Sequence, residues 1–162
     1  MNKKSLLSIL LLSVLCVVNV YSDVGVGGEI GFEAGPYYNN FFSGTIRSDK
    51  TPWTLSVNSS FFDGNIGATA DNWFVYKTVS DPVNYYVFWG ISAGLEFDDF
   101  GLNTGARIGI GLDWFILDSK ELELYCQAAW NPYLGIKHED DWDFVFRPLC
   151  FPFSTGARWW FR

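Results

Sequence analysis

Strict alternation of apolar and polar residues, repeated along most of the chain, is the feature that most limits its fold. The clearest window has an apolar side chain at every second position from Tyr85 to Phe97, and a second window runs from Ala106 to Ile116. Residues at i and i+2 point to the same side of a β-strand, whereas an amphipathic helix needs apolar residues three, four and seven apart. These windows therefore predict strands with one apolar and one polar face.

Further strands follow from the same pattern and from turn chemistry. Three more segments alternate: 24–34, 122–135 and 153–161. Pro132 interrupts the second of them and predicts a bulge or an irregular end. Short polar turn sequences lie at three places: 48–52, 80–84 and 117–120. Together with the neighbouring windows, these turns delimit three less regular strands: about 41–48, 53–61 and 65–78.

The predicted order is a meander of eight antiparallel strands. Such a sheet has to close, because an open edge would pair with other chains. The three polar turns then fall at one end of the barrel. The remaining connections fall at the other end and include the longest one, predicted as a loop over residues 136–151.

The glycines indicate which face lines the interior. Many lie on the polar face of the predicted strands: 25, 27, 31, 67, 90, 94, 105, 109, 111, 135 and 156. The apolar face carries only Gly28 and Gly44. Glycine weakens a strand that faces water, whereas small residues in a narrow barrel leave room for a few large charged ones. We therefore expect a polar lumen and an apolar outer surface.

An apolar outer surface of this length indicates a membrane. About 10 tilted residues cross the ~25 Å apolar band of an outer membrane, and the window from Tyr85 to Phe97 is long enough. Outward aromatic residues such as Trp114 and Trp130 fall near strand ends, where interfacial girdles belong. The expected fold is an all-β, eight-stranded antiparallel up-and-down transmembrane β-barrel, a single domain over residues 23–162.

The first 22 residues have the pattern of a cleavable signal peptide. Lys3 and Lys4 precede an apolar run, and small residues precede the predicted cleavage after Ser22. The apolar run is shorter than the ~20 residues of a membrane-spanning helix, which disfavours a retained anchor. A lipoprotein signal acylated at Cys16 is a third reading, disfavoured by Leu15 before it. We expect an exported protein located in the cell outer membrane.

The C-terminal strand resembles an assembly signal. Outer-membrane barrels commonly end in an aromatic residue preceded by apolar residues at every second position, which the barrel assembly machinery recognises. The last alternating residues resemble this pattern: Phe153, Thr155, Ala157, Trp159 and Phe161. Arg162 displaces the match by one residue. This resemblance implies the assembly machinery and outer-membrane lipid as partners.

Two internal segments carry a broader resemblance, GATADNWFVYKTVSDPVNYYVFWGISAGL and GARIGIGLDWFILDSKELELYCQAAWNPYLG. They look like a family of small spirochaetal outer-membrane barrels, which are similar in architecture to OmpW- and OmpA-type eight-stranded proteins. The resemblance covers roughly residues 64–162 and the glycine-rich first strand. It implies a fold and a location and identifies no reaction.

Seven charged residues lie on the polar face of the predicted strands and are therefore expected inside the barrel: Glu29, Glu33, Glu96, Arg107, Asp113, Glu123 and Arg158. Asp71 and Arg47 are assigned to the same polar face less clearly. Unpaired buried charges are costly, so we expect a network of ion pairs and hydrogen bonds. Arg107 and Asp113 share one predicted strand, and Glu96 and Glu123 lie on the two neighbouring strands.

Arg158 is expected to meet Glu29 or Glu33 across the seam that closes the barrel. This network permits two interpretations. It is a structural plug that leaves no wide pore, or a narrow gated path that favours cations because carboxylates outnumber arginines.

The sequence favours neither an enzyme nor a metal site. His138 is the only histidine, and no serine nearer than Ser154 lies in its stretch. A lone histidine provides neither a triad nor a metal cluster. We expect no catalytic residues, no metal and no cofactor. A formal charge of −7 also makes nucleic acid a poor partner.

The connections at the end opposite the polar turns are the expected contact surface. Their aromatic, acidic and histidine side chains suit recognition of an extracellular ligand: Tyr37, Tyr38, His138, Glu139, Asp140 and Trp142. Strand placement puts Cys126 and Cys150 too far apart for a disulfide, so both are expected to be free thiols.

Three roles remain open at this level. The first is a surface-exposed structural or interaction barrel, contacting its target through residues 35–40 and 136–151. The second is an OmpW-like conduit for small apolar molecules, whose mark would be an apolar tunnel with a lateral opening. The third is a soluble lipocalin-like carrier, which would need the apolar face inside.

Overall fold

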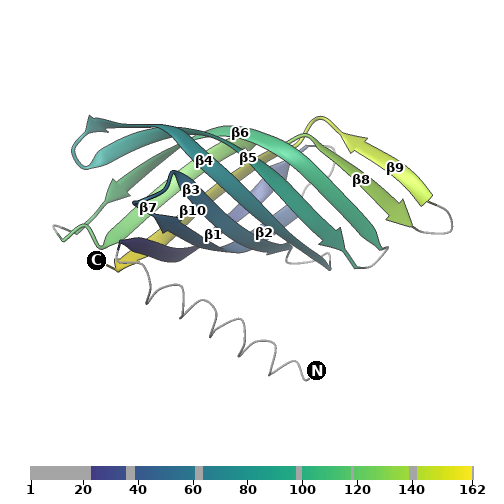
Figure 1. Cartoon of the computed structure of the whole chain (residues 1–162), viewed down its shortest axis with the longest axis horizontal. Helices are drawn as coiled ribbons and strands as arrows, with labels where there is room; N and C mark the ends of the chain where they lie inside the picture. Colours follow the sequence, from purple (N-terminus) through teal and green to yellow (C-terminus); the bar gives the residue numbers. More distant parts are fainter. Residues whose placement is uncertain are drawn as a thin grey trace, which may run out of the picture.

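The computed structural model of the chain describes residues 23–35, 39–60, 64–97, 100–117, 119–138 and 142–161. The regular elements of these residues are strands (Figure 1): β1 (Val24–Ala34), β2 (Asn39–Ser48), β3 (Trp53–Ser60), β4 (Asn65–Ser80), β5 (Val83–Glu96), β6 (Gly101–Phe115), β7 (Leu122–Trp130), β8 (Tyr133–His138), β9 (Trp142–Arg147) and β10 (Phe151–Phe161). This part of the chain contains no helix long and apolar enough to cross a bilayer. The predicted signal peptide, residues 1–22, lies outside the described residues.

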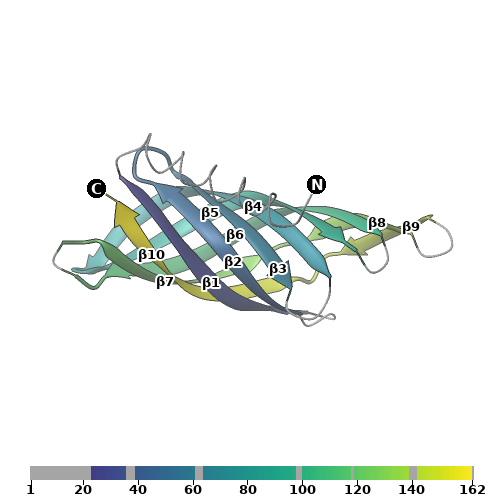
Figure 2. The same ribbon diagram turned by 90° about the horizontal axis from the view of Figure 1, so that it is seen from below.

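Eight of these strands close a ring. Each strand from β1 to β6 pairs antiparallel with the next, β6 pairs with β7, β7 with β10, and β10 with β1. The strands cross the barrel obliquely, as β1, β2 and β3 show in Figure 2. The eight-stranded antiparallel barrel predicted from the alternation is confirmed, and β2, β3 and β4 fall within two residues of their predicted ranges.

The predicted long loop at 136–151 is wrong in part, because much of it is β-structure. β8 and β9 form a hairpin. β8 pairs with residues 101–105 at the start of β6, whereas β7 pairs with residues 108–115 further along the same strand. Figure 1 shows this hairpin projecting from one end of the barrel, called the hairpin end below. Pro132 and Pro148 lie in the short breaks between β7 and β8 and between β9 and β10. Proline has no N–H to give to a ladder, which explains the interruptions.

The two faces of the sheet differ as sharply as the alternation predicts. Outward side chains are large, apolar and exposed, including Ile110 at 63%, Ile91 at 58% and Trp89 at 47%. The inward positions next to them hold Tyr86 and Phe88, both fully buried. The apolar face is therefore the outer face.

Candidate functional site

Glycines in the lumen stand between pairs of longer side chains. Arg107 on β6, Gly90 on β5 and Asp71 on β4 are successive partners across the ladders. Because Gly90 has no side chain, Nε of Arg107 reaches across it and lies 3.2 Å from Oδ1 of Asp71. A Cβ atom on Gly90 would overlap that carboxylate. The ion pair therefore requires glycine on the strand that it crosses.

Arg158 on β10 repeats this arrangement. It reaches across Gly27 on β1 and donates from Nε to Oγ1 of Thr45 on β2, at 3.0 Å. On its other side it donates to Oε1 of Glu123, its direct ladder partner on β7, at 2.8 Å. Arg158 and Glu123 are both almost completely buried. Arg158 therefore links β7, β10 and β2, and crosses β1 to do so.

Arg47 extends the pair into a charge cluster, defined here as Arg47, Asp113, Glu123 and Arg158. Arg47 lies 3.1 Å from Glu123 and 3.5 Å from Asp113. The indole Nε1 of Trp160 also donates to Glu123, at 2.7 Å. Asp113 accepts further hydrogen bonds from side chains on β4 and β5: Tyr76 and Asn84. Every charge in the cluster therefore has a partner.

Glu29 is held separately, nearer the hairpin end. The Tyr125 side chain crosses Gly156, and its hydroxyl donates to Oε2 of Glu29 at 3.2 Å. Gln127 and Ser154 donate to the same oxygen, at 3.3 and 3.0 Å. Three neutral donors thus satisfy a carboxylate that is 7% exposed. No arginine is paired with it among the described residues.

Aromatic rings fill the space around the charge cluster. The rings of Trp73 and Tyr86 stack at 3.6 Å, and Phe88 lies beside Tyr86. The Arg47 guanidinium lies 3.8 Å above the Trp73 ring, a cation–π contact. The aromatic cluster of Trp73, Tyr86 and Phe88 joins the charge cluster in a packed plug.

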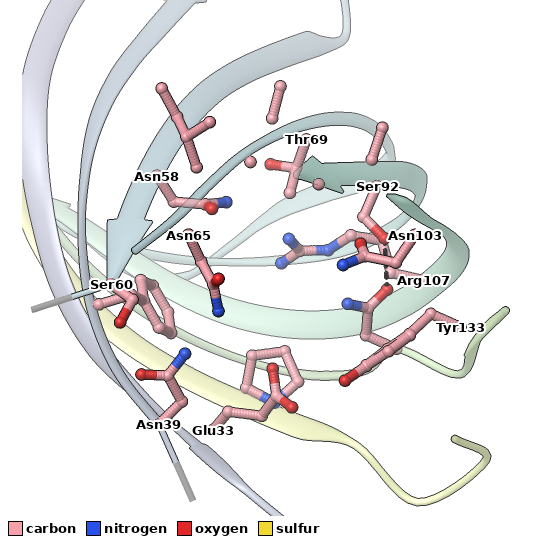
Figure 3. A pocket seen from close by; sticks show the side chains of 18 of the residues that line it. Glu33, Asn39, Asn58, Ser60, Asn65, Thr69, Ser92, Asn103, Arg107 and Tyr133 are labelled. Carbon is pink, nitrogen blue, oxygen red and sulfur yellow. Dashed lines mark hydrogen bonds between the residues drawn. The ribbon is translucent and has the colours of Figure 1, made fainter. Parts of the chain in front are cut away.

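Beyond the plug, the lumen opens into a polar vestibule at the hairpin end. Its volume is about 450 Å³. Figure 3 shows uncharged polar side chains from several strands around this opening: Asn39, Asn58, Ser60, Asn65, Thr69, Ser92, Asn103 and Tyr133. The structure thus divides the lumen into a closed half and an open half.

The structure redistributes the predicted charged residues. Arg107 pairs with Asp71, on β4. Arg158 pairs with Glu123 rather than across the closing seam with Glu29 or Glu33. The reason is that each arginine follows a ladder row, and the register of the rows was not contained in the alternation. Arg47 and Asp71, the less clear lumen residues, both take part in ion pairs.

Glu33 and Glu96 lie apart from the plug. Both line the vestibule, Glu33 from β1 and Glu96 from β5. Glu33 hydrogen-bonds the thiol of Cys150, which lies between β9 and β10 and is 1% exposed. Burial raises the pKa of this thiol well above its usual range, and the neighbouring Glu33 carboxylate raises it further. Cys126, on the outer face of β7, is partly exposed, and both cysteines are free.

Two of the six predicted recognition residues, His138 and Trp142, belong to the part of the chain that the structure describes. Tyr37, Tyr38, Glu139 and Asp140 lie outside the described residues. His138 and Trp142 end the two strands of the hairpin, and their rings stack at 4.7 Å. Trp142 is 61% exposed.

Comparison with known proteins gives a likeness of shape. No family model and no curated protein matches the chain. Among solved structures, Neisserial surface protein A is similar over 84% of this chain and 94% of its own, with 14% identity and a TM-score of 0.47. A major outer membrane protein from Thermus thermophilus is similar over 85% of this chain and 98% of its own, with 11% identity and a TM-score of 0.44.

The described residues contain no group of three or more His, Cys, Asp or Glu side chains arranged to hold a metal ion. The chemistry of the site is therefore that of its paired charges, its aromatic rings and its vestibule amides. Sequence reasoning did not single out Asn58, Asn103 or Trp73, which shape the two halves of the lumen. For Asn58 and Asn103, the available signal was the glycine opposite each of them, Gly67 and Gly94.

Proposed function

We propose that the chain is a small integral outer-membrane β-barrel with a blocked lumen, acting as a structural and surface-interaction protein. Its outer face supports a lipid environment on every side of the ring. Ile30, Val57 and Ile110, from three different strands, are each more than half exposed. A continuous apolar belt of this kind is stable against lipid and would aggregate in water.

The observation that carries the blocked lumen is the contact of Arg47 with Asp113. Arg47 belongs to β2 and Asp113 to β6, which lie on opposite sides of the eight-strand ring. Between them the Arg47 guanidinium packs on Trp73 and pairs with Glu123. Side chains thus span the whole width of the barrel, which supports a plug rather than a path for ions.

Orientation follows from the two unlike ends. We assign the tight turns near Asp49, Asp81 and Ser119 to the periplasmic side and the hairpin end to the cell exterior. A cleaved signal peptide over residues 1–22 would deliver the chain, and β10 would engage the barrel assembly machinery. Outward Phe153, Trp159 and Phe161 on β10 are each at least 40% exposed, as such a signal requires. The resemblance to small spirochaetal barrels supports the same placement.

The other roles have less support. The inner cavity is polar, whereas an apolar hollow of about 1120 Å³ lies on the outer face over β7. An outer hollow suits lipid contact and provides no tunnel for an OmpW-like conduit. A soluble carrier would need an apolar interior cavity, which the described residues do not form. For catalysis, His138 lies at the hairpin tip while Ser154 donates to Glu29 in the barrel wall, which disfavours a hydrolase.

Two measurements test the proposal. Detergent-refolded protein should migrate faster before heating than after it, as closed barrels do, and planar bilayers containing it should show no steady conductance. An Arg47→Ala, Trp73→Ala variant removes the two side chains that span the lumen and should conduct ions. Steady cation-selective conductance of the unmodified protein would overturn the blocked lumen.

A further inference from the structure

One wall of the vestibule contains a gap bounded by two amides. Asn58 on β3, Gly67 on β4, Gly94 on β5 and Asn103 on β6 form one continuous row of ladder partners. At about 4.8 Å between neighbouring strands, the two asparagine backbones are about 14 Å apart along the sheet. Only two glycines lie between them. Figure 3 shows Asn58 and Asn103 on two sides of the opening.

This row differs from the glycine positions of the plug. There a single glycine separates two side chains, and a ring or guanidinium crosses it, as Arg158 crosses Gly27. Here two glycines are adjacent in the row, and each lies beside one asparagine. A Cβ atom on Gly67 would lie 2.5 Å from Oδ1 of Asn58, and one on Gly94 would lie 2.7 Å from Oδ1 of Asn103. Each amide therefore lies over the glycine beside it and forms part of the cavity wall.

Three charged side chains of the vestibule are already engaged, whereas several of its amides are not. Glu29 accepts three hydrogen bonds, Arg107 is paired with Asp71, and Glu33 bonds the Cys150 thiol. In contrast, four asparagine side chains form no hydrogen bond with another described residue: Asn39, Asn58, Asn65 and Asn103. An amide offers both a donor and an acceptor. Apart from the Glu96 carboxylate, the groups available to a ligand are thus neutral amides that both donate and accept hydrogen bonds.

The dimensions and the remaining lining restrict the ligand further. A volume of about 450 Å³ lies within the roughly 300–1,000 Å³ of small-molecule sites. The rings of Phe41 and Tyr133 also line the cavity. A flat, neutral ring bearing several hydroxyl groups would bond the amides at its edge and contact an aromatic ring with its C–H face.

We propose that the vestibule binds a neutral pyranose sugar, either free or as the headgroup of a glycolipid. The site rests on the proposed orientation, because the vestibule must face the cell exterior to meet such a ligand. Asn58 and Asn103 bond the sugar hydroxyls, and the absence of side chains on Gly67 and Gly94 lets these two amides lie against the wall, so that the cavity beside them stays open. The proposal extends the surface-interaction role to a ligand class.

The test uses full-length protein refolded in a zwitterionic detergent, since glycoside detergents would compete. The probes are methyl α-D-glucopyranoside, methyl β-D-galactopyranoside, methyl N-acetyl-β-D-glucosaminide and maltose, followed by saturation-transfer NMR. We expect saturable binding of at least one probe with a Kd of roughly millimolar order, because few hydrogen bonds are available. Absence of saturable binding by all four probes overturns the proposal.

Variants locate the site. Asn103→Leu removes an amide, and Gly94→Leu places a side chain where the Asn103 amide lies, so each should weaken binding by at least about tenfold. Thr104→Ala, on the outer face of β6, and Gly44→Leu, where a Cβ meets nothing within 4 Å, are the matched controls. Heat-modifiable migration shows which variants are folded. Equal binding by folded site variants and controls overturns the proposed site.

Two arms separate the sources of the sugar. Barrels are placed in nanodiscs of phosphatidylglycerol, with or without monoglycosyl diacylglycerol. Loss of methyl glycoside binding in the glycolipid discs identifies a lipid headgroup, and unchanged binding identifies a soluble sugar. Conductance of the unmodified barrel would overturn the blocked lumen and leave sugar binding intact, so the two proposals fail separately.

Discussion

Tyr86 of β5 stands directly opposite Gly111 of β6, and its ring lies over the glycine where a side chain would otherwise be. The same ring stacks on Trp73 at 3.6 Å and donates from its hydroxyl to Gln127 on β7, at 3.2 Å. Gln127 is itself the ladder partner of Gly111 on the other side. One missing side chain thus allows an aromatic ring to join three strands inside the barrel.

Gly111→Ala should therefore destabilise the barrel. The added methyl group overlaps the Tyr86 ring, and overpacking of this kind costs about 1–3 kcal/mol. The measurement is urea unfolding of the refolded protein in lipid vesicles, followed by tryptophan emission. Gly44→Ala on the outer face is the control, because its new Cβ meets nothing within 4 Å. Similar unfolding midpoints for the two variants would contradict the role of Gly111.

Glu123→Gln should be more damaging than any change at the vestibule rim. Glu123 accepts from Arg158, Arg47 and Trp160 and is fully buried. Removing its charge leaves two guanidinium groups without their shared counter-ion, a loss of about 3–5 kcal/mol for a buried pair. Glu96→Gln, in the vestibule wall, should change stability by less than about 0.5 kcal/mol. Comparable losses in the two variants would show that the charge cluster does not stabilise the barrel.

The two cysteines should differ in reactivity. The thiolate is the reactive form, and burial beside Glu33 raises the pKa of Cys150, so this thiol stays protonated at pH 8. A charged maleimide should leave Cys150 unmodified in folded protein, and raising the pH should accelerate its reaction only above the range of an ordinary thiol. Cys126 on the outer face should react with a lipid-soluble maleimide. Mass spectrometry of digested protein distinguishes the sites, and rapid charged-reagent labelling of Cys150 at pH 8 would contradict its burial.

The sequence predicts which face of each strand a side chain belongs to, but not which side chain on another strand it pairs with. Period 2 alone places Arg107 in the lumen, because a shift of one residue would put it among the outward isoleucines. Its partner Asp71 lies two strands away, and only the register shows that Gly90 stands between them. Once registers are known, lumen glycines such as Gly90 and Gly27 mark where long side chains cross. The glycines indicated the lumen, whereas the ion pairs depended on strand stagger.

The hairpin was missed for a different reason. Polar residues around Glu139 and Asp140 resembled a solvated loop, although Trp142, Phe144 and Phe146 continue the alternation beyond them. In the structure these three side chains are each at least 60% exposed on the outward face of β9. The alternation at these three residues therefore predicts a strand, whereas the acidic residues before them suggested a loop.

The outward face of the hairpin should accordingly contact lipid. Phe144 pairs with Ile136 and Phe146 with Leu134, and this row continues the outer surface of β6 through Leu102. The test uses a bimane label at Phe144→Cys in a Cys126→Ala, Cys150→Ala background. This label should emit at a shorter wavelength than the same label at Val145→Cys, and brominated lipid should quench it more strongly. The adjacent Val145→Cys faces the inner side of the hairpin and is the matched control.

We expect quenching at position 144 to exceed that at position 145 by at least about twofold, because successive strand residues point to opposite faces. Equal quenching at the two positions would mean that the hairpin stands clear of the bilayer. Its outer aromatic residues would then have to be covered by something other than lipid, since a patch of this size is rarely left in water.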